Sequence, residues 1–279
     1  MGFRSRRPAV RGVLCTLSAV AALAAMTGSC SAAEPVRVTT RFDADAALGS
    51  ATAVDVALQL DPSAVTQPLN EVRFAYPRGL GVVSSGLGLA ACTRPPNDFV
   101  KVLITGPRLG GCSPNAVMGI GTARALVKLT TGGQVIPEYA SVTLLSGALE
   151  RGRLGLVAYV DGQHPFGAKL AFAGDVHDLP APYGGELTVR LPPIPGIADL
   201  ATVYVVAMHL TIGDHAIRYY ERRGGRRVAY HPEGVLLPTA CPPRGFRFRA
   251  RVGFVDGTSR TATSVVPCPS SVATPSSGR

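Results

Sequence analysis

Short runs of residues that alternate between apolar and polar side chains recur along most of the chain. In the run 36–42, Val36 and Val38 share one parity, whereas Arg37 and Arg41 lie on the other. A period of two places successive side chains on opposite faces of a strand. No segment of twelve or more residues keeps a 3.6-residue period without a Gly or Pro. The sequence therefore predicts an all-β protein.

Turn-forming residues separate these runs. The 279 residues include 32 glycines and 23 prolines, and turns are predicted at Thr131-Gly132-Gly133, Asp161-Gly162 and Asp256-Gly257. Besides 36–42, strands are predicted at 54–60, 71–76, 99–104, 123–129, 139–145, 153–160, 169–173, 186–191, 202–211 and 246–254. Short strands at this spacing are typical of antiparallel β-sandwiches. We expect such a sandwich, with a small helical turn near 146–150.

The N-terminal residues 1–33 have the pattern of a secretory signal peptide. Four arginines precede an uncharged stretch over 13–26, and Ser31 and Ala33 fit a cleavage site after residue 33. A retained N-terminal anchor, or a lipid on Cys30, is the alternative. No other apolar run approaches the length of about 20 residues that a membrane span needs, so no transmembrane segment is expected in the mature chain.

The rest of the chain divides simply. Residues 34–269 are predicted to form one β-sandwich domain, with two lobes that meet near residue 213 as the alternative, and 270–279 a disordered tail. An exported protein, extracellular or associated with the cell envelope, is expected.

Four of the six cysteines lie after the predicted signal peptide, namely Cys92, Cys112, Cys241 and Cys268. An even number of cysteines in an exported chain favours disulfides. Three pairings are possible, and the local pairs Cys92–Cys112 and Cys241–Cys268 are favoured because each closes a short loop. None of the spacings matches a zinc site, so no metal or cofactor is predicted.

Sequence motifs for catalysis are sparse. The chain has no Gly-x-Ser-x-Gly, Ser-x-x-Lys or His-Glu-x-x-His motif and no phosphate-binding loop. The densest group of acid–base residues is Asp161, His164, Asp175, His177 and Asp178, joined more remotely by His209, Asp214 and His215. Ordinary turn chemistry explains these residues equally well. A secreted hydrolase or metal-dependent enzyme that uses these loops is the alternative function.

Positive charge is concentrated near the C-terminus. The formal charge of +10 falls to +6 without residues 1–33, and the window 218–251 alone carries +7, from nine arginines and two glutamates. The remainder of the mature chain is therefore close to neutral. Such asymmetry indicates an anionic partner.

The pattern inside this window predicts a basic surface. The segments 217–223 and 226–230 flank Gly224-Gly225, which favours a tight hairpin. Within 246–254 the aromatic residues share one parity and three arginines the other. If the hairpin lies alongside that strand, Arg and Tyr form one exposed strip. The candidate binding residues are Arg218, Arg222, Arg223, Arg226, Arg227, Arg247, Arg249 and Arg251.

Two interpretations of this strip stay open. It could bind an anionic envelope polymer, a lipid headgroup or an acidic protein through arginine forks. It could equally be a solvated face whose charges prevent pairing at a sheet edge. Nucleic acid is not expected as a partner of an exported protein.

Several short motifs resemble a loose group of exported, β-rich proteins of unassigned function from high-G+C bacteria. The motifs are Tyr76-Pro77-Arg78-Gly79-Leu80, Gly111-Cys112-Ser113-Pro114, Gly119-Ile120-Gly121-Thr122-Ala123, and a terminal segment from Cys241-Pro242-Pro243 through Asp256-Gly257-Thr258 to Pro267-Cys268-Pro269. The resemblance supports the two local disulfides and implies no catalytic residues. The expected function is that of a non-catalytic, envelope-associated binding or structural module.

Overall fold

Almost every regular element among the described residues is a β-strand. The computed structural model describes residues 34–81, 86–92, 108–150, 153–165, 167–191 and 199–270, so the predicted signal peptide, the strand at 99–104 and residues 271–279 lie outside the described residues. The strands are β1 (Val36–Phe42), β2 (Ala51–Thr52), β3 (Val54–Leu60), β4 (Leu69–Pro77), β5 (Val117–Leu129), β6 (Val135–Glu150), β7 (Arg153–His164), β8 (Lys169–Asp178), β9 (Tyr183–Arg190), β10 (Ala201–Ile212), β11 (Tyr219–Arg223), β12 (Arg226–Tyr230), β13 (Val235–Leu236), β14 (Phe246–Phe254) and β15 (Ser259–Val266). Two short 3-10 helices, η2 (Arg108–Gly111) and η3 (Pro114–Ala116), precede β5.

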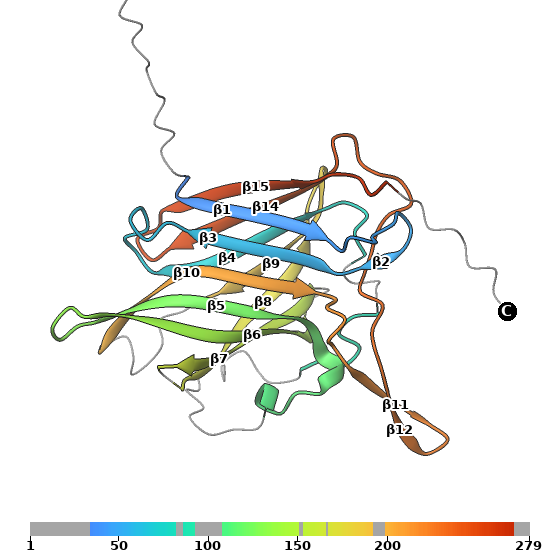
Figure 1. The fold of residues 1–279 in the computed structure, drawn as a ribbon, viewed down its shortest axis with the longest axis horizontal. Helices are drawn as coiled ribbons and strands as arrows, with labels where there is room; N and C mark the ends of the chain where they lie inside the picture. The colour runs from blue at the N-terminus through green and yellow to red at the C-terminus, as the bar shows by residue number, and fades with distance from the viewer. Residues whose placement is uncertain are drawn as a thin grey trace, which may run out of the picture. The chain divides into compact units, whose positions relative to one another are not determined.

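Eleven of the described strands form one antiparallel sheet, in the order β1-β3-β10-β5-β6-β7-β8-β9-β4-β14-β15. The sheet curls until its two edge strands, β1 and β15, lie side by side (Figure 1). At this seam the Thr40 amide and hydroxyl both donate to the Ser264 hydroxyl oxygen, at 3.0 and 2.8 Å. Side-chain hydrogen bonds thus bring the sheet close to a closed barrel.

The all-β, antiparallel prediction is confirmed, but a sandwich of two facing sheets is not. The segments on the two sides of residue 213 contribute strands to the same sheet, since β10 and β14 both belong to it. The strands β5, β6, β7, β8 and β9 are neighbours in chain order. By contrast, β4 lies between β9 and β14, which are far from it in the sequence. One curled sheet buries one continuous face without needing a second sheet.

Two local predictions are wrong. The helical turn expected near 146–150 is instead the end of β6, where the pairing with β7 shifts register between Ser146 and Leu149. The turn expected at Asp161-Gly162 lies inside β7, because Asp161 pairs with Lys169 of β8. In both places ladder pairing with neighbouring strands overrides the local turn signal.

The interior of the curled sheet is the main core, and the alternation of β14 shows how the sequence builds it. Phe246 and Phe248 are at most 1% exposed, and the Phe42 ring meets the edge of Phe246 at a centroid distance of 5.1 Å. Phe74 stacks on Phe248 at 5.6 Å. The arginines of β14 occupy the opposite parity and therefore point outward.

A second, smaller apolar cluster covers the outer face of β5 to β7. Leu145, Val157 and Tyr159 pack there against residues of the loop before β5 and of the segment that leads into β11, including Tyr219. This cluster supports the base of the β11–β12 hairpin.

Both predicted disulfides are confirmed. Cys92–Cys112 and Cys241–Cys268 are bonded, with Cα–Cα distances of 5.2 and 5.8 Å. Disulfides form and persist in oxidising compartments. The two bonds therefore indicate an oxidising, extracellular environment.

The seam between β1 and β15 provides a test of the closure. Replacing Ser264 by Ala leaves the amide of Thr40, a buried residue, without its acceptor. We expect the free energy of unfolding to fall by about 1–3 kcal/mol, measured by urea denaturation. T263A is the control, because the neighbouring Thr263 is exposed. Equal stability of S264A and the wild type would contradict a closing role for this contact.

Candidate functional site

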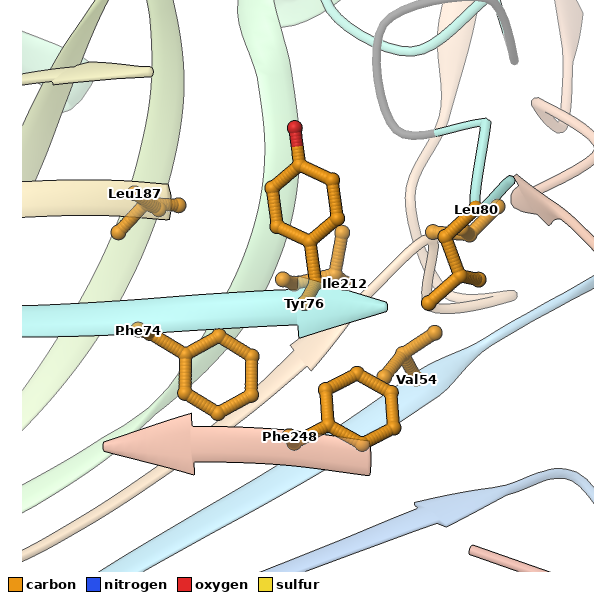
Figure 2. A pocket seen from close by; sticks show the side chains of 8 residues that line it. Val54, Phe74, Tyr76, Leu80, Leu187, Ile212 and Phe248 are labelled. Carbon is orange, nitrogen blue, oxygen red and sulfur yellow. The ribbon is translucent and has the colours of Figure 1, made fainter. Parts of the chain in front are cut away.

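The interior of the sheet contains a small apolar cavity beside the stacked rings of Phe74 and Phe248 (Figure 2). The cavity measures about 20 Å³, whereas pockets for small molecules measure roughly 300–1,000 Å³. Its lining consists of Val54, Phe74, Tyr76, Leu80, Leu187, Ile212, Val235 and Phe248. In Figure 2 the Tyr76 hydroxyl points away from the rings of Phe74 and Phe248. This cavity is a gap in core packing.

The β11–β12 hairpin forms as the sequence predicts. Its two-residue loop is Gly224-Gly225, with φ of +55° and +80°, and left-handed angles at both positions are what a tight type I′ hairpin turn requires. The strands pair Arg222 with Arg227 and Arg223 with Arg226. Like charges directly opposite each other destabilise a strand pair. The tip of the hairpin therefore carries an electrostatic cost that its own fold does not remove.

The base of the hairpin is fixed to the rest of the protein. Tyr219 is 0% exposed; its hydroxyl donates to the Val117 carbonyl and accepts from the Gly88 amide at 2.7 Å. The side-chain amide of Asn115 donates to the Tyr220 carbonyl and accepts from the Tyr220 amide, both at 2.8 Å. Burial raises the pKa of the Tyr219 hydroxyl above its ordinary value of 10.0. These contacts hold the base in one position while the tip projects from the sheet (Figure 1).

We call the exposed arginines 218, 222, 223, 226 and 227, together with Tyr220, the hairpin surface. The Arg227 guanidinium lies over the Tyr220 ring at 3.7 Å from its centroid. The Arg223 guanidinium pairs with the Glu221 carboxylate. The hairpin surface is thus a strongly basic, well-positioned surface with one carboxylate beside it.

Arg247, Arg249 and Arg251, here called the β14 row, lie on a different part of the molecule. The hairpin forms a two-stranded sheet of its own and does not pair with β14. The condition for one continuous strip of Arg and Tyr is therefore not met, and the predicted binding residues divide into two surfaces.

The middle arginine of the β14 row is already engaged by the protein. Arg249 donates to the Glu186 carboxylate at 3.2 Å, and its guanidinium lies 4.7 Å from the centroid of the Tyr183 ring. Arg251 donates to the Ser259 hydroxyl at 3.3 Å. The β14 row thus has less free donor capacity than the hairpin surface.

Glu186 is the centre of a charged cluster on the outer face of β8, β9, β4 and β14. Its side chain is only 6% exposed, and its carboxylate oxygens lie 3.2 Å from Arg249, 3.5 Å from His177 Nε2 and 3.8 Å from Arg73. Arg73 also forms a two-pronged contact with Glu71, and this contact raises the pKa of its guanidinium. Three cationic or basic side chains thus cover one buried carboxylate, which we call the Glu186 cluster.

His177 lies between two carboxylates of the cluster region. Its Nε2 faces Glu186, and its Nδ1 lies 3.6 Å from Asp175. A carboxylate therefore lies close to each ring nitrogen, at a distance longer than a hydrogen bond. The Asp175 carboxylate also pairs with Arg190 at 3.3 Å. The contacts of the cluster link side chains of β4, β8, β9 and β14.

The other residues of the predicted Asp/His group do not converge on His177. Asp161 pairs in register with Lys169, eight residues from His177 on β8, which corresponds to roughly 26 Å along the strand at about 3.3 Å per residue. His164 lies at the end of β7, and its side chain is outside the described set. Asp178 lies at the end of β8.

The more remote members of the group have separate local partners. His209 lies 3.7 Å from Asp55, His215 lies 3.2 Å from Asp43, and Asp214 accepts from the Ala216 amide at 2.6 Å. Within the described ranges, no group of three or more His, Cys, Asp or Glu residues is arranged to hold a metal ion.

Sequence patterns did not single out Glu186, Arg73 or the anchor Tyr219. Glu186 lies on the polar parity of its strand, where exposure is the default expectation, and it is buried because Arg73, His177 and Arg249 from three other strands cover it. Only the order of the strands in the sheet brings these four residues together. No local signal in the sequence carries that information.

Comparisons of the chain with protein-family models, with curated proteins and with solved structures found no significant match. Among the residues that the structure describes, no helix is long and apolar enough to cross a membrane.

Removal of the Glu186 charge tests whether the Glu186 cluster is structural. In E186Q three basic side chains lose a buried anionic partner, and we expect the free energy of unfolding to fall by about 1–3 kcal/mol. The partial exposure of Arg73 and Arg249 limits this effect. D45N, which removes one charge from an exposed position, is the control in the same denaturation experiment. If the Glu186 cluster does not stabilise the fold, E186Q and D45N will have the same free energy of unfolding.

Substitution of Tyr219 tests the contacts that attach the base of the hairpin to the rest of the protein. Y219F leaves the Val117 carbonyl and the Gly88 amide without a partner, at an expected cost of about 1–3 kcal/mol in urea denaturation. Y230F is the control, because it keeps the ring that meets Tyr219 edge-on at 5.8 Å.

Comparison of Y219F with the wild type also gives a pH test. Because the folded-state pKa of Tyr219 is raised by burial, its contribution to stability is complete below about pH 10 and is lost as the pH rises through the raised pKa. The wild type should therefore lose more stability above about pH 10 than Y219F does. An identical alkaline loss in both proteins would argue against burial of this hydroxyl.

Proposed function

We propose that this protein is an exported, non-catalytic binding module that uses the hairpin surface to attach to an anionic component of the cell envelope. The observation that carries the proposal is the like-charge pair Arg222–Arg227, whose side chains are both exposed near the tip of a projecting hairpin. An anion bound between such arginines replaces mutual repulsion by charge-assisted hydrogen bonds. The hairpin then gains stability in the bound state.

Export is supported by independent features of the chain. Residues 1–33 have the pattern of a signal peptide, and the two disulfides fit an oxidising compartment. Association with the envelope follows from the combination of export and a localised basic surface. The resemblance to exported β-rich bacterial proteins points in the same direction.

The hairpin surface is favoured over the β14 row as the main contact. Arginine forks bind carboxylates and phosphates best when their donors are free. Arg249 has a buried carboxylate partner in Glu186, whereas a single glutamate, Glu221, lies beside the five arginines of the hairpin surface. The β14 row is a secondary surface in this proposal.

The alternative of a hydrolase or metal-dependent enzyme needed Asp161, His164 and His177 to converge in a cleft. The strand register separates Asp161 from His177 by eight positions on β8, and carboxylates lie close to both ring nitrogens of His177. Binding through arginine is therefore the better supported function.

Retention on envelope material provides the test. We expect R222Q/R227Q to bind at least tenfold more weakly than the wild type, which corresponds to about 1.4 kcal/mol, in a pull-down with isolated cell envelopes. Wild-type binding should also weaken as salt rises from about 50 to 300 mM, because exposed charges are screened.

The matched variant is R247Q/R251Q, which removes the same charge from exposed positions of the β14 row. We expect it to lose less than threefold in retention. Equal losses in the two variants would mean that retention follows net charge rather than a site, and retention that ignores both salt and the hairpin substitutions would disprove the proposed function.

A further inference from the structure

We propose that one side of the hairpin, formed by Arg218, Tyr220, Arg222 and Arg227, binds a linear polyanion that carries repeated phosphate or carboxylate groups. This inference rests on the proposed function, and it names the contact face and the class of ligand.

The two sides of the hairpin differ in their free charge. Successive side chains of a strand point to opposite faces, so Tyr219, Glu221 and Arg223 share one side. On that side Tyr219 is buried against the sheet and Glu221 pairs with Arg223. The other side presents Arg222 and its cross-strand partner Arg227, both exposed, and the register places no carboxylate there. We call this other side the open side.

The open side contains a ready clamp for one anionic group. Arg222 and Arg227 lie directly opposite each other, and the Cβ atoms of such pairs are about 5 Å apart. Two guanidinium forks at this spacing can donate to the same phosphate or carboxylate. The Tyr220 ring, 3.7 Å from the Arg227 guanidinium carbon, holds one fork in place before binding, which lowers the entropic cost of association.

Arg218 extends the open side along the chain. It is exposed between the buried residues Ile217 and Tyr219, and by parity it shares the side of Tyr220 and Arg222. Arg222 lies four positions after Arg218, which is about 13 Å of extended chain. A small anion clamped by Arg222 and Arg227 leaves Arg218 without a partner, whereas a polymer can contact both positions. Affinity should therefore grow with the length of the anionic chain.

The tip of the hairpin favours a polymer over a lipid bilayer. Between Arg222 and Arg227 the chain contains only Arg223, Gly224, Gly225 and Arg226, and all four are exposed. Stable attachment to a membrane surface combines buried apolar area with electrostatic attraction. This tip offers charge without an apolar anchor, so a hydrated polyanion is the better match.

Binding of defined probes to the purified, disulfide-bonded protein tests the inference. The probes are long-chain polyphosphate, tripolyphosphate, polygalacturonate and vesicles that contain phosphatidylglycerol, measured by titration calorimetry at low salt. We expect at least one of the two polymers to bind at least tenfold more tightly, per anionic group, than tripolyphosphate or the vesicles. The preferred polymer then distinguishes phosphate from carboxylate.

A pair of variants within the hairpin tests the contact face. R222Q/R227Q removes two charges from the open side, and we expect at least a tenfold loss of polymer affinity. R223Q/R226Q removes the same charge from the opposite side a few residues away, and we expect less than a threefold loss. Circular dichroism spectra that match the wild type would show that both variants fold.

Three results would overturn the inference. Equal losses in the two variants would exclude a single contact face, tripolyphosphate that binds as tightly as the polymers would remove the need for a long ligand, and preferential vesicle binding would identify a lipid surface. In each case hairpin-dependent retention on envelopes would leave the proposed function intact. Loss of that retention would instead disprove the function itself.

Discussion

The curled sheet encloses one of its faces as the main core, and this constraint decides on which face most of its described charged side chains lie. Along β14 the aromatic residues Phe246 and Phe248 enter the interior, so Arg247, Arg249 and Arg251 must point outward. The closer the sheet comes to a barrel, the more completely the interior is reserved for apolar groups. Among the described residues of β14, the charged groups therefore lie on the outer face of the sheet.

In two places the outer face of the sheet is also covered by other side chains. Over β5 to β7 a second apolar cluster covers the sheet and supports the segment that leads into β11. Over β8, β9, β4 and β14 the covering groups are charged, and they bury the Glu186 carboxylate. The apolar cluster gives the hairpin a rigid base outside the large sheet. The Glu186 cluster uses arginine to hold neighbouring strands together.

Local patterns predicted the parts of the fold that depend on local physics. Period-two alternation located most strands, the Gly224-Gly225 pair located the hairpin, and loop closure favoured the two disulfides that the structure contains. The order of the strands was not predictable in this way, because the position of β4 between β9 and β14 depends on contacts between segments far apart in the chain. For the same reason the sequence could not distinguish a sandwich from a single curled sheet, or reveal that Glu186 is buried.

The same distinction separates the two groups of arginines that one stretch of sequence supplies. In β14 the neighbouring strands bring Glu186 to Arg249, so part of the positive charge is neutralised within the protein. In the hairpin each strand has only the other as its neighbour, and the register sets Arg222 against Arg227 and Arg223 against Arg226. The hairpin forms a two-stranded sheet of its own, and Glu221, which pairs with Arg223, is the carboxylate that its strands supply. Charge that the fold cannot neutralise internally is charge that a partner can neutralise, which is why the projecting hairpin rather than the barrel wall is the stronger candidate for binding.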